Sequence, residues 1–146
     1  MATDPLVDDD YRRLLLLRTG LRRYLRWSEE QARNVGLTPA QHQLLLAVRG
    51  HEGELGPTIG DVADALLLKH HSAVELVQRA EAAGLLRRVP DRTDGRVVRL
   101  ALSRRAKVAL ERLSALHLEE LQRLADPIRP PWEGLEPVGP LATVRS

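Results

Sequence analysis

The chain has 146 residues, of which 43% are hydrophobic and 29% are charged, and its formal net charge at pH 7 is only +2. These values predict one globular domain and exclude a largely disordered chain, and so small a charge does not by itself indicate a nucleic-acid partner. The absence of cysteine excludes disulfides, thiolate metal sites and cysteine redox switches, and no apolar run approaches the roughly 20 residues that cross a bilayer.

The chain begins with an acidic stretch that contains four aspartates, and we expect 1–10 to be a flexible N-terminus. This start lacks the basic and apolar regions of a secretory signal, so a cytoplasmic protein with no membrane partner is expected. Residues 11–34 are predicted to form a long amphipathic helix, because their apolar side chains recur at spacings of three and four. This stripe contains Leu14, Leu17, Leu21, Tyr24 and Leu25. Leu15 and Leu16 widen it beyond what one neighbouring helix would cover, which indicates contact with a second subunit.

Three shorter helices are predicted in the middle of the chain. Thr38, which precedes a proline, is a good N-cap for a helix over about 39–48, and a loop with three glycines follows this helix. Thr58 is predicted to cap the next, short helix. The third helix begins near His70 and is expected to end at Gly84, because glycine readily adopts the left-handed conformation that closes a helix.

The hydrophobic period then changes from about 3.6 to two residues, which predicts strands. Residues 86–91 and 96–102 are expected to pair as a β-hairpin across an Asp-Gly turn. Pro90 cannot donate a hydrogen bond to a sheet, so this hairpin should be exposed at an edge. Ser103 is predicted to cap a final long helix over 104–125. The apolar seam of that helix contains Ala106, Leu110, Leu113, His117, Leu121 and Leu124.

The order of these elements predicts a mainly α fold with a small β-hairpin wing, an α+β class. Residues 11–125 would form a winged helix-turn-helix domain with one long helix at each end. The remaining segment, 126–146, holds five of the nine prolines and is predicted to be a Pro-rich tail rather than a regular helix.

Positive charge is concentrated in the predicted hairpin and at the start of the final helix. Residues 87–107 contain eight basic and only two acidic residues, an excess of six positive charges. A hairpin carrying this charge after a helix-turn-helix pair favours contacts with the phosphates of duplex DNA. The alternative interpretation is a charged hairpin that is simply solvated.

The sequence resembles the MarR (multiple antibiotic resistance regulator) family of winged-helix transcription factors over about residues 11–125. The wing motif of that family is an Asp-x-Arg followed, after five residues, by Leu-Thr, and here it reads Asp94-Gly95-Arg96 and then Leu102-Ser103. The segments 37–41, 58–63 and 79–88 are similar to other blocks of the family. The resemblance implies a homodimer, usually a repressor, that binds a palindromic operator in double-stranded DNA and responds to a small ligand.

The resemblance also implies which residues contact DNA. Arg96 would enter the minor groove, steadied by Asp94, while side chains of the recognition helix read bases. The predicted DNA-binding residues are Arg96, Asp94, Arg92, His71, Ser72, Glu75, Gln78, Arg79, Lys69 and His70. Glu75 stands where the family often has arginine. It is predicted either to accept a hydrogen bond from a cytosine amino group or to pair with Arg79 one helical turn later.

In the family the two long terminal helices form the dimer interface, which agrees with the wide apolar stripe. The predicted interface residues are Leu14, Leu17, Leu21, Leu110, Leu113, His117 and Leu121. Tyr24, Trp27 and His42 are predicted to line a pocket for a small aromatic or phenolic effector. His117 lies on an apolar seam, where we expect a core histidine with satisfied hydrogen bonds rather than a metal ligand.

Other classes of function have less support in the sequence. It has no Gly-x-Ser-x-Gly, no phosphate-binding glycine loop and no His-Glu-x-x-His, so neither an enzyme nor a cofactor is expected. The spacing of the histidines does not match a metal site, so no metal is expected. A winged-helix module for protein contacts, or an activator without a ligand-responsive operator, remains as an alternative function.

Overall fold

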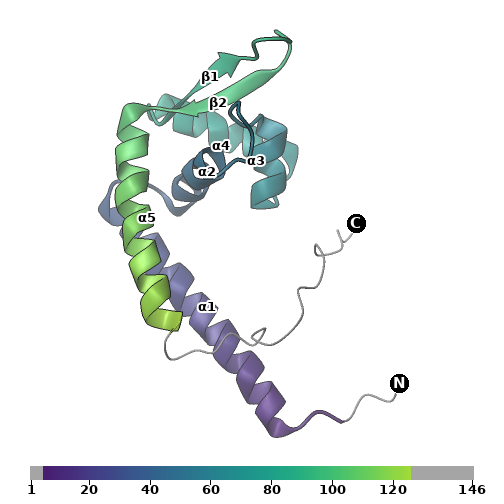
Figure 1. Cartoon of the computed structure of the whole chain (residues 1–146), viewed down its shortest axis with the longest axis vertical. Helices are drawn as coiled ribbons and strands as arrows, with labels where there is room; N and C mark the ends of the chain where they lie inside the picture. Colours follow the sequence, from purple (N-terminus) through teal and green to yellow (C-terminus); the bar gives the residue numbers. More distant parts are fainter. Residues whose placement is uncertain (1–4, 126–146) are drawn as a thin grey trace.

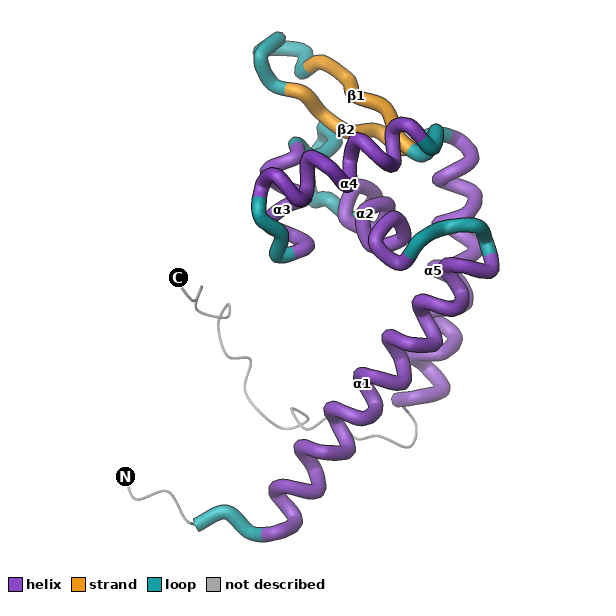
Figure 2. Tube along the Cα trace, turned by 180° about the vertical axis from the view of Figure 1, so that it is seen from behind, coloured by secondary structure: helices purple, strands orange, loops and turns teal. Residues whose placement is uncertain are grey.

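The computed structural model describes residues 5–125, so the predicted Pro-rich tail at 126–146 lies outside the described residues (Figure 1). Its elements are α1 (Asp8–Asn34), α2 (Pro39–Arg49), α3 (Ile59–Leu66), α4 (His70–Ala82), β1 (Leu86–Pro90), β2 (Val98–Leu102) and α5 (Arg104–Ala125). The predicted winged helix-turn-helix with two long terminal helices is therefore confirmed. In Figures 1 and 2, α1 and α5 extend away from the body formed by α2, α3 and α4, while the hairpin projects from the opposite end.

Helix α1 begins at Asp8, three residues earlier than predicted, so the last part of the expected flexible N-terminus is helical. Three aspartates occupy its first turn, where carboxylates interact favourably with the positive end of the helix dipole. The Asp10 carboxylate also accepts a hydrogen bond of 2.9 Å from the Val7 backbone N–H. The acidic run that resembled a solvated tail is thus the start signal of the helix.

The predicted caps of α2 and α3 are confirmed. The Thr38 hydroxyl accepts from the Gln41 backbone N–H at 3.1 Å, and the Gln41 side chain accepts from the Thr38 N–H at 3.0 Å. Thr58 and Asp61 exchange the same two hydrogen bonds, at 3.1 and 2.9 Å. These reciprocal pairs satisfy backbone donors that a helix start leaves free. They fix where the two helices begin and therefore how the helix-turn-helix is oriented.

The hairpin has shorter strands and a longer turn than the sequence predicted. Leu86 pairs with Leu102 and Pro90 pairs with Val98, so the residues at 91–97 form a loop that is longer than the predicted connection at 92–95. The Asp-Gly pair lies inside this loop. The carboxylate of Asp91 holds the loop by accepting several of its hydrogen bonds, which a rule based on turn dipeptides does not anticipate.

The core lies where α2, α4, α5 and the hairpin meet. Its fully buried large side chains include Leu44, Leu45, Val62, Val77, Leu100 and Leu113. Leu110 and Leu113 are only 3% and 0% exposed and belong to this core cluster. The prediction that these two leucines contact a partner subunit is therefore wrong, because neither has surface left for a partner to touch.

The apolar stripe of α1 is exposed in the single chain. Leu14 and Leu21 are 54% and 50% exposed, and Leu17 is half-buried. Leu121 near the end of α5 is 45% exposed. These are large apolar side chains without cover in one chain, unlike the core leucines of α5. No helix in the described part of the chain is long and apolar enough to cross a membrane.

Candidate functional site

Helix α4 presents a polar face outward because its opposite face is fixed in the core. Ala73, Val77 and Ala80 are buried at spacings of four and three. The predicted base-reading and phosphate-binding residues therefore lie on the remaining face. Lys69, His70, His71, Glu75, Gln78 and Arg79 are exposed, and Ser72 is half-buried. The structure thus brings all seven predicted residues of this segment to one continuous surface.

Glu75 is free to face a ligand in the absence of DNA. Among the ion pairs of residues 5–125, none joins Glu75 to Arg79, although the two are one helical turn apart. The contact that would hold Glu75 back against its own helix is therefore not formed. Both roles considered for this carboxylate stay predictions, and the Glu75→Gln variant separates them.

We expect Glu75→Gln to reduce sequence discrimination by the protein. In the base-reading role the carboxylate would accept from a cytosine amino group, whereas the amide replaces one of its acceptor oxygens by a donor. The loss should be about 1–3 kcal/mol at one position in each half-site, while binding to random DNA rises as phosphate repulsion is relieved. Affinities for a set of single-base operator variants measure this effect. Equal gains on all sequences, with discrimination unchanged, would contradict base reading.

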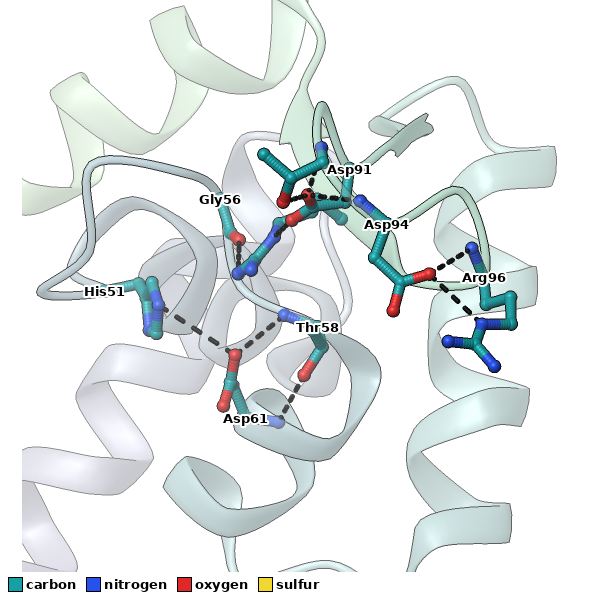
Figure 3. A network of polar contacts seen from close by, with 9 residues as sticks. His51, Gly56, Thr58, Asp61, Asp91, Asp94 and Arg96 are labelled. Carbon is teal, nitrogen blue, oxygen red and sulfur yellow. Dashed lines mark hydrogen bonds and ion pairs between the residues drawn. The ribbon is translucent and has the colours of Figure 1, made fainter.

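The tip of the wing carries the predicted Arg96 and Asp94, and the expected contact between them is present. The Arg96 side chain is 93% exposed, and its Nε donates to Asp94 Oδ1 over 3.2 Å (Figure 3). The same oxygen accepts from the Arg96 backbone N–H over 3.1 Å. Arg92 is exposed in the same loop. The Arg96 guanidinium therefore projects into solvent from a turn that Asp94 helps to shape.

The sequence did not reveal the residues that hold this loop in place. Asp91 Oδ1 accepts from the Thr93 and Asp94 backbone N–H groups over 2.8 and 3.2 Å. Asp91 Oδ2 accepts from Arg99 Nε over 2.8 Å, and Arg99 Nη1 donates to the Gly56 carbonyl over 3.1 Å. The hydrogen bonds from Thr93, followed by that from Arg99, hold the pKa of Asp91 well below its ordinary range.

Four of the eight basic residues counted in this region are engaged within the chain. Arg96 pairs with Asp94, Arg99 binds Asp91 and Gly56, Arg88 pairs with Glu81 over 3.4 Å, and Arg105 donates to the Ala83 carbonyl. The charge count made from the sequence could not distinguish these residues from the rest. Arg87, Arg92, Arg104 and Lys107 are exposed, and so is the side chain of Arg96 despite its pair with Asp94.

A pocket of about 580 Å³ lies where α1, α2 and α5 meet. Its lining includes Tyr24, Ser28 and Glu29 from α1, His42 and Leu46 from α2, and Ser114, His117 and Leu121 from α5. Two of the three predicted pocket residues, Tyr24 and His42, are thus brought together. Trp27 lies behind the lining, with its ring centroid 4.9 Å from that of His117. The sequence had assigned His117 to the dimer interface, and the structure corrects this by placing the side chain within the chain, against the pocket.

His117 is the core histidine with satisfied hydrogen bonds that the sequence predicted. Its Nδ1 lies 2.6 Å from the Leu113 carbonyl, which can only accept, so Nδ1 carries the hydrogen. In the neutral ring Nε2 then accepts from the Ser28 hydroxyl, 2.6 Å away. The His42 ring centroid is 4.9 Å from that of His117. Burial, and to a smaller extent the charge of His117, lower the pKa of His42.

The free energy of unfolding should decrease as the pH falls below the ordinary histidine value of 6.5. Because the pKa of His42 is lower in the folded chain, the unfolded chain takes up the proton first and is stabilised by it. The decrease should begin near the ordinary histidine pKa of 6.5 and continue as the pH falls towards the lower pKa of His42 in the folded chain. Asp61 and Asp91, whose pKa values are lowered by hydrogen bonds from Thr58 and from Thr93 and Arg99 respectively, cause a separate decrease at lower pH, where the unfolded carboxylates with their ordinary pKa of 3.8 take up protons.

Urea unfolding at several pH values measures this dependence. The His42→Gln variant should show a flatter profile over the same range, whatever its stability at pH 7. The matched control is His70→Gln, which removes an exposed histidine and should keep the slope of the parent chain. An unchanged slope in His42→Gln would mean that another group takes up the proton.

The residues that could hold a metal ion do not cluster in the described part of the chain. Within residues 5–125, no group of three or more His, Asp or Glu side chains is arranged to bind one. The pocket at α1, α2 and α5 is lined mainly by apolar and aromatic side chains with a few polar groups, which is typical of small-molecule sites.

The arrangement of α3, α4 and the hairpin defines a winged helix-turn-helix protein of the DNA-binding class. Residues 35–97, which contain α2, α3, α4 and β1, match the profile of the MarR family. This part of the chain is therefore similar to the MarR family of winged helix-turn-helix transcriptional regulators.

Solved structures of this family have the same fold. A MarR family protein from Bacillus stearothermophilus is 25% identical, with a TM-score of 0.70 and 86% of each chain covered. AbsC, a MarR family transcriptional regulator from Streptomyces coelicolor, is 20% identical, with a TM-score of 0.70 over 90% of this chain and 88% of that chain. A mutant MepR from Staphylococcus aureus, bound to an oligodeoxyribonucleotide, is 20% identical, with a TM-score of 0.63 over 82% of this chain and 86% of that chain. No curated protein sequence matches the chain significantly.

Proposed function

We propose that this chain is a MarR family regulator, namely a homodimeric repressor that binds a palindromic operator and is released by a small aromatic or phenolic effector. The observation that carries the proposal is the wing arginine, Arg96, which is 93% exposed and held by Asp94 in a chain whose helix α4 also carries exposed polar residues. A guanidinium on a projecting turn suits the negative potential of a narrow minor groove, while a helix of this kind suits the major groove. The oligodeoxyribonucleotide bound to the MepR mutant supports duplex DNA as the partner.

The exposed apolar face of α1 supports a second copy of the chain as the other partner. Leu14, Leu21 and Leu121 are each about half exposed, and burying such side chains is favourable by roughly 25 cal/mol per Å² of apolar surface. A palindromic operator requires two reading heads related by twofold symmetry, which a homodimer supplies. In this proposal Leu14, Leu17, Leu21 and Leu121 form the dimer interface, while Leu110, Leu113 and His117 stabilise each chain.

The pocket offers a place for an effector to act on DNA binding. It lies between α2 and the two long helices, and α2 in turn packs against both α3 and α4. A ligand against Tyr24 and His42 would change the spacing between the proposed dimer helices and the reading head. This role is tested by screening aromatic and phenolic compounds for stabilisation against heat, and then by asking whether the stabilising compounds release the operator.

Arg96→Ala should weaken operator binding by about 1–3 kcal/mol while leaving the helical content and unfolding temperature unchanged. The reason is that, within residues 5–125, this side chain makes no hydrogen bond or ion pair apart from the exposed pair with Asp94. Arg92→Ala is the matched control in the same loop, and it should mainly lower the slope of log affinity against log salt by about one unit, as loss of a phosphate contact does. Unchanged affinity of Arg96→Ala at every salt concentration would make Arg96 a residue that only shapes the turn.

Selection of operators from random duplex DNA tests the function as a whole. A repressor of the proposed kind selects a sequence with inverted repeats and binds it as a dimer. A protein-interaction module selects no sequence. An activator without a ligand-responsive operator selects a sequence but is not released from it by any compound that occupies the pocket.

A further inference from the structure

A continuous chain of polar contacts runs from the tip of the wing to the loop before α3 (Figure 3). Arg96 binds Asp94, whose own backbone N–H donates to Asp91 Oδ1 over 3.2 Å. The other Asp91 oxygen accepts from Arg99 Nε over 2.8 Å. Arg99 Nη1 reaches the carbonyl of Gly56 over 3.1 Å, 43 residues away in the sequence. Each contact fixes the position of the group that makes the next one.

At its far end, this series of polar contacts reaches the backbone segment that lies between β2 and the start of α3. The backbone N–H of Leu100 in β2 donates to the Pro57 carbonyl over 2.9 Å, so the segment at 56–57 runs beside β2. Thr58 comes next and caps α3 through its exchange with Asp61. The loop of the wing is therefore tied, through Arg99, to the backbone from which the helix-turn-helix begins.

We propose that Asp91 and Arg99 are positioning residues for Arg96. They contact no DNA themselves, and they set the place and direction in which the wing arginine enters the groove. This inference rests on the proposed binding of an operator through Arg96. Arg99 is one of the eight basic residues in the charge count of 87–107, and the proposal gives it a role within the chain rather than at a phosphate.

The geometry of the pair favours positioning over phosphate contact. The Asp91 side chain is only 5% exposed and that of Arg99 only 26%, whereas that of Arg96 is 93% exposed. Arg99 already uses Nε and Nη1 within the chain, and a phosphate contact through these atoms would leave Asp91 as a desolvated carboxylate without its partner. The two oxygens of Asp91 have different tasks, since one holds the loop and the other holds Arg99.

A double-mutant cycle on operator affinity tests the proposal, with salt low enough for the Arg96→Ala protein still to bind. Asp91→Asn and Arg99→Gln should each weaken operator binding about tenfold, since a misplaced Arg96 loses about as much as one specific contact supplies. In the Arg96→Ala background each should change affinity by less than about twofold, because there is no longer an arginine to position. Helical circular dichroism and the unfolding temperature identify any variant that has failed to fold.

Arg99→Lys separates the two roles without removing charge. A lysine keeps a positive charge for a phosphate but cannot bind Asp91 and the Gly56 carbonyl with two fixed donors. Under the proposal, the Arg99→Lys protein loses about as much affinity as the Arg99→Gln protein. If Arg99 instead contacted a phosphate, the Arg99→Lys protein would bind almost like the parent. Arg87→Gln is the matched control, because it removes an exposed arginine from the neighbouring strand. Any loss that it causes should persist in the Arg96→Ala background.

The proposal is overturned if the losses from Asp91→Asn and Arg99→Gln persist in the Arg96→Ala background, or if neither variant loses affinity in the parent chain. It is also overturned if Arg99→Lys binds like the parent and Arg99→Gln alone lowers the salt slope by about one unit. These outcomes leave operator binding intact and so spare the proposed function. A parent chain that selects no operator sequence overturns the proposed function instead, and the positioning role with it.

Discussion

Leu113→Glu is expected to unfold the chain rather than to dissociate a dimer. The side chain is 0% exposed and lies in the core cluster with Leu44, Leu45 and Leu100. A carboxylate there is removed from water without a cationic partner, and the apolar packing contacts of the leucine are lost. The two effects together should cost more than about 4 kcal/mol, a large part of the stability of a domain of this size. Circular dichroism should show loss of helix at 25 °C or a much lower unfolding temperature.

Leu121→Glu is the matched control on the same helix. Leu121 is 45% exposed, so a glutamate can reach water in the single chain, and the helical signal should be retained. In the proposed dimer this charge would be buried, so sedimentation should give the mass of one chain at micromolar concentration. A folded, dimeric Leu113→Glu protein would contradict the core assignment. A parent chain that sediments as a monomer would contradict the dimer.

The elements that the sequence predicted well are those with local determinants. Thr38 and Thr58 mark helix starts because each forms its hydrogen bonds with a residue only three positions away. Gly84 follows α4 with a φ of 72°, in the left-handed region that was predicted. The alternation of Leu100 and Leu102 on one face of β2 likewise depends only on neighbours in sequence. Such signals suffice to establish a winged helix-turn-helix.

Features that depend on what covers a surface could not be read in the same way. Helical spacing places Leu113, His117 and Leu121 on one seam, but it does not say whether that seam meets the same chain or another. The structure divides the seam, because α2 and α1 cover its first part and leave Leu121 half exposed. The link from Arg99 to Gly56 spans 43 residues, and charge counting treated Arg99 like any other arginine. The sequence shows that an aspartate, Asp91, lies in the same hairpin, but only the structure shows that its side chain is buried against Arg99.

Gly56→Ala should destabilise the chain by about 2–3 kcal/mol, the usual cost of forcing an added methyl into a packed site. A Cβ at this position would lie 2.2 Å from the Leu100 carbonyl oxygen, which is backbone and cannot rotate away. Neither side can retreat freely, because the Leu100 N–H is bonded to the Pro57 carbonyl and the Gly56 carbonyl accepts from Arg99. The segment must therefore separate from β2, which breaks both contacts. The unfolding temperature should fall by roughly 10 °C for a chain of this length.

Gly60→Ala is the control that isolates this close approach from the general effect of replacing glycine. Gly60 lies within α3, and its added Cβ would be 3.6 Å from the Thr58 hydroxyl, an ordinary contact. Alanine is favoured over glycine in helices by up to about 1 kcal/mol, so this variant should be as stable as the parent or more stable. Gly56→Ala should also bind operator less well than its loss of stability explains, because Arg99 loses its anchor on the body. If Gly56→Ala unfolds at the parent's temperature, the loop does not pack against β2 as described.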